Sequence, residues 1–325
     1  MLAEPEAYGL HGNADITKDL GDTNQMLATL IKTGGSSDAG GGGQEELVAE
    51  LAKGILEKLP ANFDIEAAGL KYPVLYEESM NQVLCQEMLR YNGLLSVVRT
   101  SLVNLDKAIA GLIVMSGDLE TVFNSFALNQ VPAMWKGKSF PSMKGLGSYV
   151  ADLMARLNML TSWYEDGQPP TFWLPGFFFT PSFTTAALQN FARKNKLAID
   201  SIEYRYEMLD GAHTDYPEPP EDGIYVYGLF LEGCGWDKQR KILAESQPKQ
   251  LFVESPAMWL QPVRVAEKEQ TAGYQCPVYR TADRRGVLAT TGHSTNFLMF
   301  VEMPSDLPET HWTMRGVCLL TSLTD

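Results

Sequence analysis

The sequence predicts an α+β protein in which an N-terminal helical bundle is followed by an antiparallel β-barrel or sandwich. Two observations predict this order. Up to about residue 195 the apolar residues recur every three or four positions, which is the period of helices with one buried face. Beyond Lys196, short β-type runs follow one another, separated by Pro, Gly and charged turns and with no helix between them. At 325 residues the chain exceeds the usual size of one domain, so two units are expected.

Composition and charge exclude several classes of protein. The formal net charge of −14 argues against a nucleic-acid partner or an anionic membrane surface, because phosphate contacts need clustered Lys and Arg. No run of about 18 apolar residues occurs, and the N-terminus lacks the features of a secretion signal, so we expect a soluble chain. Cys85, Cys234, Cys276 and Cys318 lie far apart, which favours buried reduced thiols over a disulfide framework or a zinc site.

The first helix is predicted over residues 13–31, with Asn13 as its N-cap. Its apolar face consists of Ile16, Leu20, Leu27 and Leu30. The segment 34–43 is rich in Gly and Ser and is predicted to be a flexible loop, because these residues cannot offset the entropy lost on ordering. A second helix follows over residues 44–59 and ends at Pro60.

The strongest helical signal predicts one long helix over residues 76–112. Its apolar stripe consists of Leu84, Met88, Tyr91, Leu95, Val98, Leu102, Leu105, Ile109 and Leu112. Steps of four and three over about four heptads place these residues on one side of the helix. The stripe is compatible with a coiled coil formed with a partner, but its flanks lack regular charge pairs. Packing along the chain's own domain is therefore the favoured interpretation.

Shorter helices are predicted up to about residue 127, over 147–163 and over 184–194. Between the last two lies the aromatic segment FWLPGFFFTPSF, residues 172–183. Exposing so many rings would be costly, at about 25 cal/mol per Å² of apolar surface. We therefore expect this segment to seal the junction between the two halves or to contact a neighbouring domain.

The predicted strands lie in SIEYRYEML, IYVYGLFLEG, PAMWLQPV, CPVYR, NFLMFVEM and RGVCLLTSL. Residues 274–303 form a strand–turn–strand unit in which the polar segment TTGHST is the turn. Nearly every residue of 296–302 is apolar, so this run is predicted to be a central core strand covered on both faces.

Candidate catalytic patterns are weak. Gly137–Lys138–Ser139 resembles the end of a phosphate-binding loop, but Pro132 replaces the required glycine and no strand leads into it. His293, with Ser294 and Thr290, has the side chains of a base and a nucleophile, but no nucleophile elbow is present.

One cysteine and a cluster of carboxylates are also better explained by structural roles than by catalysis or metal binding. Cys276, at the start of a strand, is predicted to be a small core residue rather than a nucleophile. The acidic loop does not have the spacing of a calcium-binding loop and is predicted to be solvated. Its carboxylates are Asp210, Asp215, Glu218, Glu221 and Asp222. The residues by themselves therefore predict no enzyme.

Several motifs in a fixed order resemble the C-terminal end of an axonemal dynein heavy chain. The motifs are YGLHGNADI, LVNLDKAIAGLIVMS, VPAMW, LGSYVADLMARL, FWLPGFFFTPSFTTAALQNFARKN, DGIYVYGLFLEG, QCPVYRT, TTGHSTNF and HWTMRGVCLL, and together they cover nearly the whole chain. The Gly-rich insertion and Cys234–Gly235 depart from the family pattern and leave the subtype open. The resemblance implies that residues 1–71 are the helical end of the sixth AAA+ module. It implies that 72–196 and 197–325 are the helical and β-barrel halves of the C-terminal domain.

The resemblance also implies a function. It is that of a non-catalytic regulatory and structural module, which packs on the AAA+ ring of the same heavy chain and modulates ATP-driven, microtubule-based ciliary motility. ATP and Mg would bind elsewhere in the parent motor, so no cofactor is expected in this chain. The expected partners are the rest of the heavy chain and the axonemal dynein complex, without nucleic acid, membrane or direct microtubule contact. The expected location is the cytoplasm and cytoskeleton, at the axoneme of a cilium or flagellum.

Packing residues are the only site residues that we predict. They are Leu84, Tyr91, Leu95, Leu102, Trp135, Trp173, Phe177, Phe178, Phe179 and Trp259. Two other functions remain open from the sequence. One is a coiled-coil adaptor that uses the helix 76–112, and the other is a hydrolase or binding module centred on His293.

Overall fold

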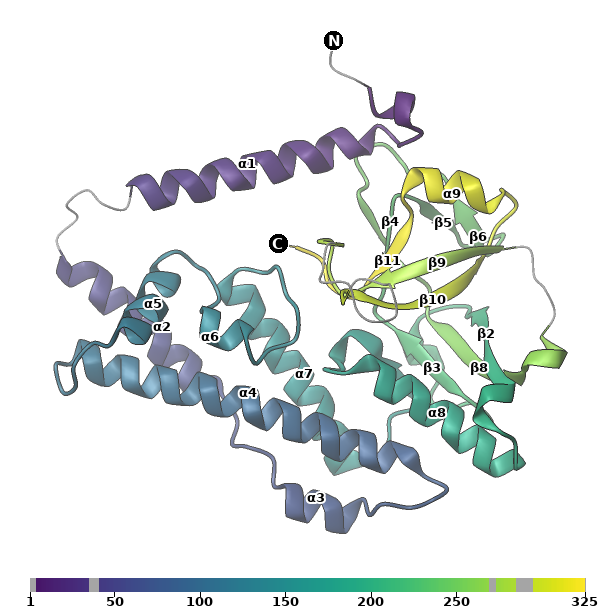
Figure 1. Cartoon of the computed structure of the whole chain (residues 1–325), viewed down its shortest axis with the longest axis horizontal. Coiled ribbons are helices and arrows are strands. Elements are labelled where there is room, and N and C mark those ends of the chain that lie inside the picture. Colours follow the sequence, from purple (N-terminus) through teal and green to yellow (C-terminus); the bar gives the residue numbers. More distant parts are fainter. Residues whose placement is uncertain (1–3, 35–40, 269–272, 285–294, 325) are drawn as a thin grey trace.

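The computed structural model describes residues 4–34, 41–268, 273–284 and 295–324 (Figure 1). Its helical part, residues 13–195, is followed by a β part, residues 202–320. The helices of the first part are α1 (Asn13–Gly34), α2 (Gly41–Lys58), α3 (Ile65–Lys71), α4 (Ser79–Ile109), α5 (Gly117–Ala127), α6 (Ala133–Lys136), α7 (Leu146–Asp166) and α8 (Thr180–Asn195). Most of the Gly-rich segment predicted as a flexible loop lies outside the described residues. Within those ranges, no helix combines the length and apolarity needed to cross a bilayer.

The long helix α4 is the centre of the helical part, and α2, α5, α7 and α8 pack against it (Figure 1). Its buried apolar residues are Met80, Val83, Leu84, Met88, Tyr91, Leu94, Leu95, Val98, Leu102 and Leu105. The predicted stripe is therefore confirmed from Leu84 to Leu105, and this part of it packs inside the chain rather than against an outside partner. The helix is shorter than predicted. Tyr76 and Leu112 lie beyond its ends, and they are 70% and 75% exposed.

The aromatic segment lies at the junction of the two parts, as predicted. The rings of Phe172, Phe177 and Phe183 pack together, and the centroids of Phe177 and Phe183 are 4.0 Å apart. The segment also contains β1 (Thr171–Trp173), which pairs in parallel with β3 (Ile224–Tyr227). Gly228 allows this approach, because a Cβ atom at its φ of 91° would lie 2.4 Å from Trp173 Cδ1. The helical part thus supplies an edge strand to a sheet of the β part.

The described strands of the β part form two sheets and a hairpin. Its other elements are β2 (Ile202–Met208), β4 (Phe230–Glu232), β5 (Gly235–Asp237), β6 (Ile242–Ala244), β7 (Phe252–Glu254), β8 (Met258–Arg264), β9 (Gly273–Tyr279), β10 (Phe297–Pro304), α9 (Glu309–Arg315) and β11 (Cys318–Leu320). The first sheet has the order β1-β3-β8-β2 and the second has the order β10-β9-β11-β4-β7, while β5 and β6 pair with each other.

The prediction of a purely antiparallel barrel or sandwich needs correction. The pairs β1–β3 and β9–β11 are parallel, so both sheets are mixed. Among the described residues the strands form separate sheets rather than a closed barrel. Helix α9 also lies between β10 and β11, where the sequence predicted no helix. Strand β10 runs opposite to β9, and β10 and α9 together form the connection between the parallel strands β9 and β11.

The prediction that residues 296–302 form a central strand covered on both faces is wrong. Strand β10 is at the edge of its sheet, and Phe300 is 43% exposed. The edge is partly occupied by β2, since the Tyr206 hydroxyl donates a hydrogen bond of 2.9 Å to the Phe300 carbonyl. Lys268 bridges Glu203 and Glu302 at 3.6 Å each and joins the same two sheets.

One continuous apolar core extends from Val48 in α2 to Leu319 in β11. Helix α8 connects the two parts, because it packs against α4 on one side and contacts β2 on the other (Figure 1). The division of the chain at residues 71 and 196 stays a prediction, and the core crosses both positions.

Candidate functional site

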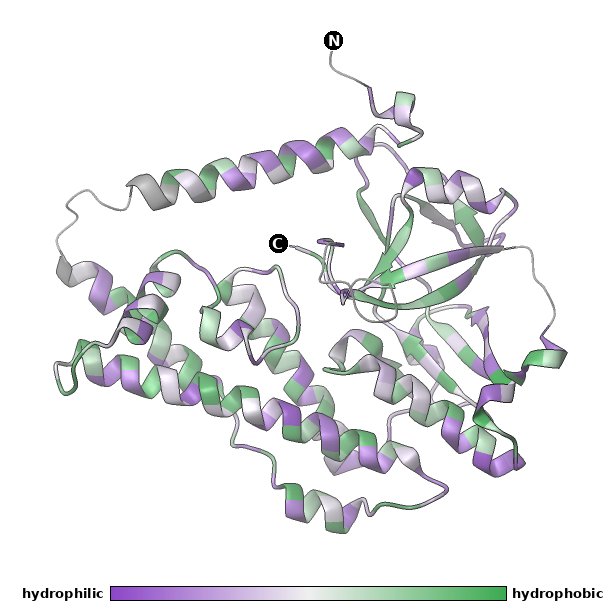
Figure 2. Ribbon diagram, viewed as in Figure 1, coloured by the Kyte–Doolittle hydropathy of each residue, from purple (hydrophilic) through white to green (hydrophobic). Residues whose placement is uncertain are grey.

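Helix α1 presents apolar side chains to solvent. Leu20, Met26 and Leu27 are 50%, 65% and 51% exposed. Figure 2 shows hydrophobic residues recurring along α1, although the helix lies apart from α4 and α7. A helix with apolar residues on one face is ordinarily stabilised by burying that face against another surface. The predicted apolar face of this helix is therefore a candidate docking surface.

Other large exposed apolar residues are also concentrated in the helical part. Leu112 and Val114 in the α4–α5 connection are 75% and 89% exposed. Leu70 at the end of α3 and Val74 after it are 85% and 78% exposed. Exposed apolar groups that gather in one region mark interaction surfaces more often than scattered single residues do. The residues near α3 and in the α4–α5 connection lie away from α1 (Figure 1), so the candidate docking surface is the apolar face of α1 alone.

The N-terminal end of α1 is fixed to the β part by Asn13. The Asn13 amide Nδ2 donates hydrogen bonds of 2.9 Å and 3.0 Å to the carbonyl groups of Gln247 and Gln250. Its Oδ1 accepts one of 2.8 Å from the Lys249 amide. Only 9% of Asn13 is exposed. The sequence predicted an N-cap role, whereas the side chain bonds to a distant turn.

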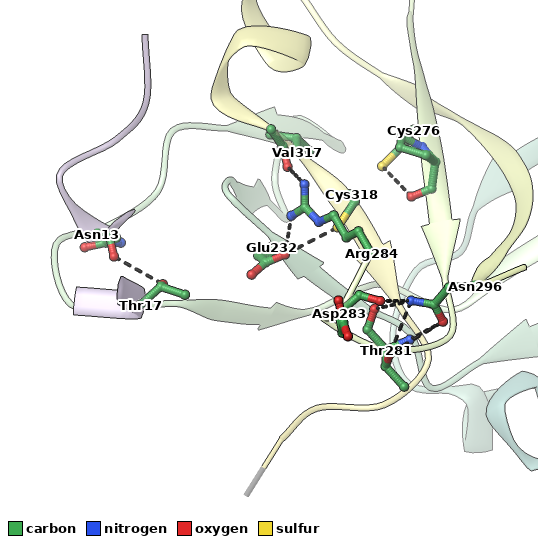
Figure 3. Close-up of polar contacts among 12 residues, drawn as sticks. Asn13, Thr17, Glu232, Cys276, Thr281, Asp283, Arg284, Asn296, Val317 and Cys318 are labelled. Atoms are coloured by element: carbon green, nitrogen blue, oxygen red, sulfur yellow. Dashed lines mark hydrogen bonds and ion pairs between the residues drawn. The ribbon is translucent and has the colours of Figure 1, made fainter. Parts of the chain in front are cut away.

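A cleft of about 200 Å³ lies beside this anchor. In Figure 3, Asn13 and Thr17 stand on one side of it, and Glu232 and Arg284 stand on the other. The segment before α1 touches the β part as well. Gly9 has a φ of 79°, and a Cβ atom there would lie 2.8 Å from Met314 Cε in α9. Residues 9–17 are thus seated on the β part.

An ion pair forms the far wall of the cleft. Arg284 is paired with Glu232, and its Nη1 donates a hydrogen bond of 2.8 Å to the Gly316 carbonyl (Figure 3). The Cys318 thiol lies 3.5 Å from the Glu232 carboxylate and donates to it. Burial raises the pKa of Cys318 strongly, so this thiol is protonated at neutral pH. The wall is a set of mutually satisfied polar groups.

The cysteines of the β part are buried, and their raised pKa values favour the neutral thiol at neutral pH. Cys276 is fully buried, and this burial raises its pKa well above the ordinary value. Burial also raises the pKa of Cys234, to about 12. Only the thiolate is an effective nucleophile or metal ligand. The prediction that Cys276 is a core residue is confirmed.

The predicted packing residues hold the chain mainly to itself. Those that are buried are Leu84, Tyr91, Leu95, Leu102, Trp135 and Phe177. Trp173, Phe178 and Trp259 are half-buried. Phe179 is 42% exposed, and the Arg90 guanidinium lies 5.2 Å from its ring centroid. The α4 residues of this set are buried inside the protein, so they are not available as the interface of a coiled-coil adaptor.

The sequence reasoning missed two buried polar networks at the junction of the parts. In the first, the fully buried Glu87 accepts hydrogen bonds from the Phe178 and Phe179 amides and from Arg90. Glu87 lies three residues after Leu84 and four before Tyr91, so it is on the buried stripe. A charged residue at such a position is a signal that could have identified it.

The second network surrounds Arg156, which is 3% exposed. Its Nε donates a hydrogen bond of 3.0 Å to Asp152, and its Nη1 donates to the Pro175 carbonyl. The Tyr91 hydroxyl donates one of 2.8 Å to the Gly176 carbonyl. Both donors hold the turn that follows β1. Their role is to position the aromatic segment, not to carry out chemistry.

The remaining candidates take no part in a recognisable site. Gly137–Lys138–Ser139 follows α6 rather than a strand, and Ser139 Oγ is 2.7 Å from the Tyr149 hydroxyl. Asp210 and Asp222 pair with Lys241 and Lys194, each at 2.7 Å. Within the part of the protein that is described, no group of three or more His, Cys, Asp and Glu side chains is placed to hold a metal ion.

The His293 hypothesis falls outside the described residues, as do Ser294 and Thr290. The residues that flank this segment, up to 284 and from 295, are described. Asn296 Nδ2 donates a hydrogen bond of 3.0 Å to the Thr281 carbonyl, and Asn296 Oδ1 accepts one of 3.2 Å from the Thr281 amide. These bonds fix the two ends of the connection between β9 and β10.

The structure is thus an α+β domain with a candidate docking surface on α1 and buried polar networks at the junction of its two parts. Residues 21–321 match the family described as the C-terminal domain of the dynein heavy chain, and the protein belongs to this family. It is 49% identical to dynein axonemal heavy chain 3 of Homo sapiens over 324 residues, which cover 99% of this sequence and 8% of that protein.

Two other relatives agree. Dynein axonemal heavy chain 12 of Homo sapiens is 47% identical over 323 residues (99% of this sequence and 10% of that protein). Dynein axonemal heavy chain 1 of Rattus norvegicus is 47% identical over 320 residues (98% and 7%). These relatives confirm the resemblance and indicate a cytoskeletal location, in the axoneme of a cilium or flagellum. The 325 residues span a tenth or less of their length. The matched domain is not itself the ATPase site of such a motor.

Proposed function

We propose that this protein is a non-catalytic regulatory and structural module that packs on the AAA+ ring of its own heavy chain and modulates ATP-driven, microtubule-based motility. One observation carries the proposal: α1 exposes Leu20, Met26 and Leu27 in a sequence that spans only 8% of a relative's length. The surface that covers this helix is then supplied by the remainder of the heavy chain, which also contains the sites for ATP and Mg. The axonemal dynein complex is the assembly in which the module acts.

Charge supports an indirect role in motility. With a net charge of −14, the module is a poor ligand for the acidic surface of a microtubule. The purified module is therefore expected neither to hydrolyse ATP nor to co-sediment with microtubules. Clear activity in either assay would exclude a non-catalytic module without direct microtubule contact.

The docking of α1 can be tested by amide hydrogen exchange. In the complete heavy chain, wild-type α1 is expected to exchange more slowly than in the 325-residue protein, because docking buries it. The double variant Leu20→Glu with Leu27→Glu is expected to remove that protection. In the 325-residue protein alone the same variant should change stability by less than about 0.5 kcal/mol, since both side chains are half exposed.

The matched control is Lys18→Glu with Gln25→Glu. Both positions lie two residues earlier on the same helix, about 200° around it, and both are exposed. This control should keep the protection that the docked helix has. Equal exchange of wild-type α1 in the complete heavy chain and in the 325-residue protein would contradict docking through this face.

A further inference from the structure

The sequence YGLHGNADI (residues 8–16) contacts the β part at the start of α1, ahead of α2 to α8 in the chain. The contacts of Asn13 are with residues 234 to 237 positions later in the sequence. All of α2 to α8 lies between the two contact points in the sequence. The start of α1 is therefore connected to the β part by direct hydrogen bonds, and this connection bypasses α2 to α8.

The partner of Asn13 is a single tight turn. The Gln250 amide donates a hydrogen bond of 3.1 Å to the Gln247 carbonyl, which closes a four-residue turn. Pro248 is its second residue, and Lys249, the third, has a φ of 69°. This is the arrangement of a type II turn, in which the third position ordinarily requires Gly. The hydrogen bond from the Lys249 amide to Asn13 helps to hold that conformation, so the turn and the anchor depend on each other.

An amide side chain is well suited to such a connection. Asn supplies two donors and an acceptor on one short, planar group, and here all of them meet backbone atoms of one turn. These bonds fix the orientation of Asn13 relative to the turn as well as the distance between them, because hydrogen bonds weaken steeply with misalignment. A displacement of residues 9–17 therefore moves the turn with them or breaks all these bonds together.

We propose that Asn13 is a coupling residue that transmits displacement of the preceding heavy chain directly to the β part, through the turn 247–250. This inference rests on the proposed function, because it gives the route by which the ring and the module influence each other. Helix α1 then has two separate roles: its apolar face docks, and its first residue couples.

The first test measures the connection itself in the 325-residue protein. Asn13→Ala is expected to speed hydrogen exchange at the Lys249 amide about tenfold, the change that the loss of one typical hydrogen bond gives. Amides in α4 should be unaffected. The control Asn24→Ala changes an exposed asparagine of the same helix and should leave Lys249 protected. Unchanged exchange at Lys249 in Asn13→Ala would overturn the coupling, whatever the module does in the motor.

The second test uses the complete heavy chain and gliding velocity on microtubules. Removal of residues 197–325 is expected to change velocity, and Asn13→Ala should change it in the same direction and by less. Asn13→Asp keeps the size of the side chain but turns an oxygen toward the Gln247 and Gln250 carbonyls, so it should act like Asn13→Ala.

The outcomes separate the two proposals. Wild-type velocity in both Asn13 variants, beside altered velocity after removal of 197–325, would overturn the coupling and leave the regulatory function standing. Wild-type velocity after removal of 197–325 would overturn the regulatory function and the coupling with it. Altered velocity in both Asn13 variants, with wild-type velocity in Asn24→Ala, would support the coupling.

Discussion

Glu87 shows how one side chain positions a helix from another part of the fold. It has no solvent exposure, and its carboxylate accepts hydrogen bonds from the two amides that precede α8. Burial raises the pKa of Glu87 above the ordinary 4.5, although these amides and Arg90 lower it. The cost of keeping a charge in the core thus exceeds the electrostatic gain from its partners.

The substitution Glu87→Gln is expected to destabilise the protein by about 2 kcal/mol at pH 7, because an NH₂ group replaces an oxygen that accepts from a backbone amide. The difference should depend on pH. Between pH 4.5 and the higher pKa in the folded state, the folded protein binds a proton that the unfolded protein releases. Lowering the pH from 7 toward 4.5 therefore stabilises the wild type relative to Glu87→Gln. Urea denaturation of both proteins across this range measures it.

Glu78→Gln is the control for replacing a carboxylate that accepts a backbone amide at the same helix. Glu78 precedes α4 and is half-buried, and its carboxylate accepts hydrogen bonds from the Met80 amide and from Asn190 Nδ2. An advantage of the wild type over Glu87→Gln that shrank as the pH fell would show that the folded pKa of Glu87 is lowered instead.

Among the elements, α4 is the helix against which most others pack. We expect substitutions on its buried side and on its exposed side to differ in their effect on stability. Leu95 is fully buried and Leu89 is 60% exposed, on the same helix. Leu95→Ala is expected to cost about 2–5 kcal/mol, because it removes buried methyl groups and leaves a cavity. Leu89→Ala is expected to change stability by less than about 0.5 kcal/mol. Similar losses for both in denaturant unfolding would contradict the inward orientation of the stripe.

Elements with a long periodic pattern were predictable, and elements decided by distant partners were not. Helices α4 and α7 and strand β2 follow from spacing alone, since their buried residues recur at a fixed period. Strand β1 has three residues and exists through its pairing with β3, which lies about fifty residues later. Residues of β10 are apolar enough for a central strand, yet the order of strands in a sheet is not encoded in one strand's composition.

The candidate site was predicted less well than the fold. The apolar face of α1 was visible in the sequence, because Leu20 and Leu27 are on one side of a helix. The role of Asn13 could not be predicted, because asparagine is suited both to an N-cap and to a long-range anchor. Only the fold, which places the Lys249 amide beside the Asn13 side chain, distinguishes the two roles. A coiled-coil interface on the long helix stayed open as an alternative for a similar reason: burial inside the protein and burial against a partner leave the same pattern.

At the scale of the whole molecule, the apolar core is shared by both parts. It includes Phe183 of α8 and Val226 of β3, so the core is continuous across the two parts. We therefore expect helix content by far-ultraviolet circular dichroism and tryptophan fluorescence to change together in urea, in one transition. Phe183→Ala should move both signals to lower urea by the same amount. Two separated transitions would show that the parts unfold independently.

The long-range contact of Asn13 has a consequence for synthesis on the ribosome. Its partners are the backbone groups of residues 247, 249 and 250, so the anchor cannot form until more than two hundred further residues have been made. At roughly 5–20 residues per second, the segment before α1 waits on the order of 10–50 s for its binding turn. During this interval α2 to α8 can fold, and the exposed leucines of α1 stay open to chaperones or to heavy chain that is already folded. The order of translation therefore leaves the exposed leucines of α1 accessible before the bonds between Asn13 and residues 247–250 can form.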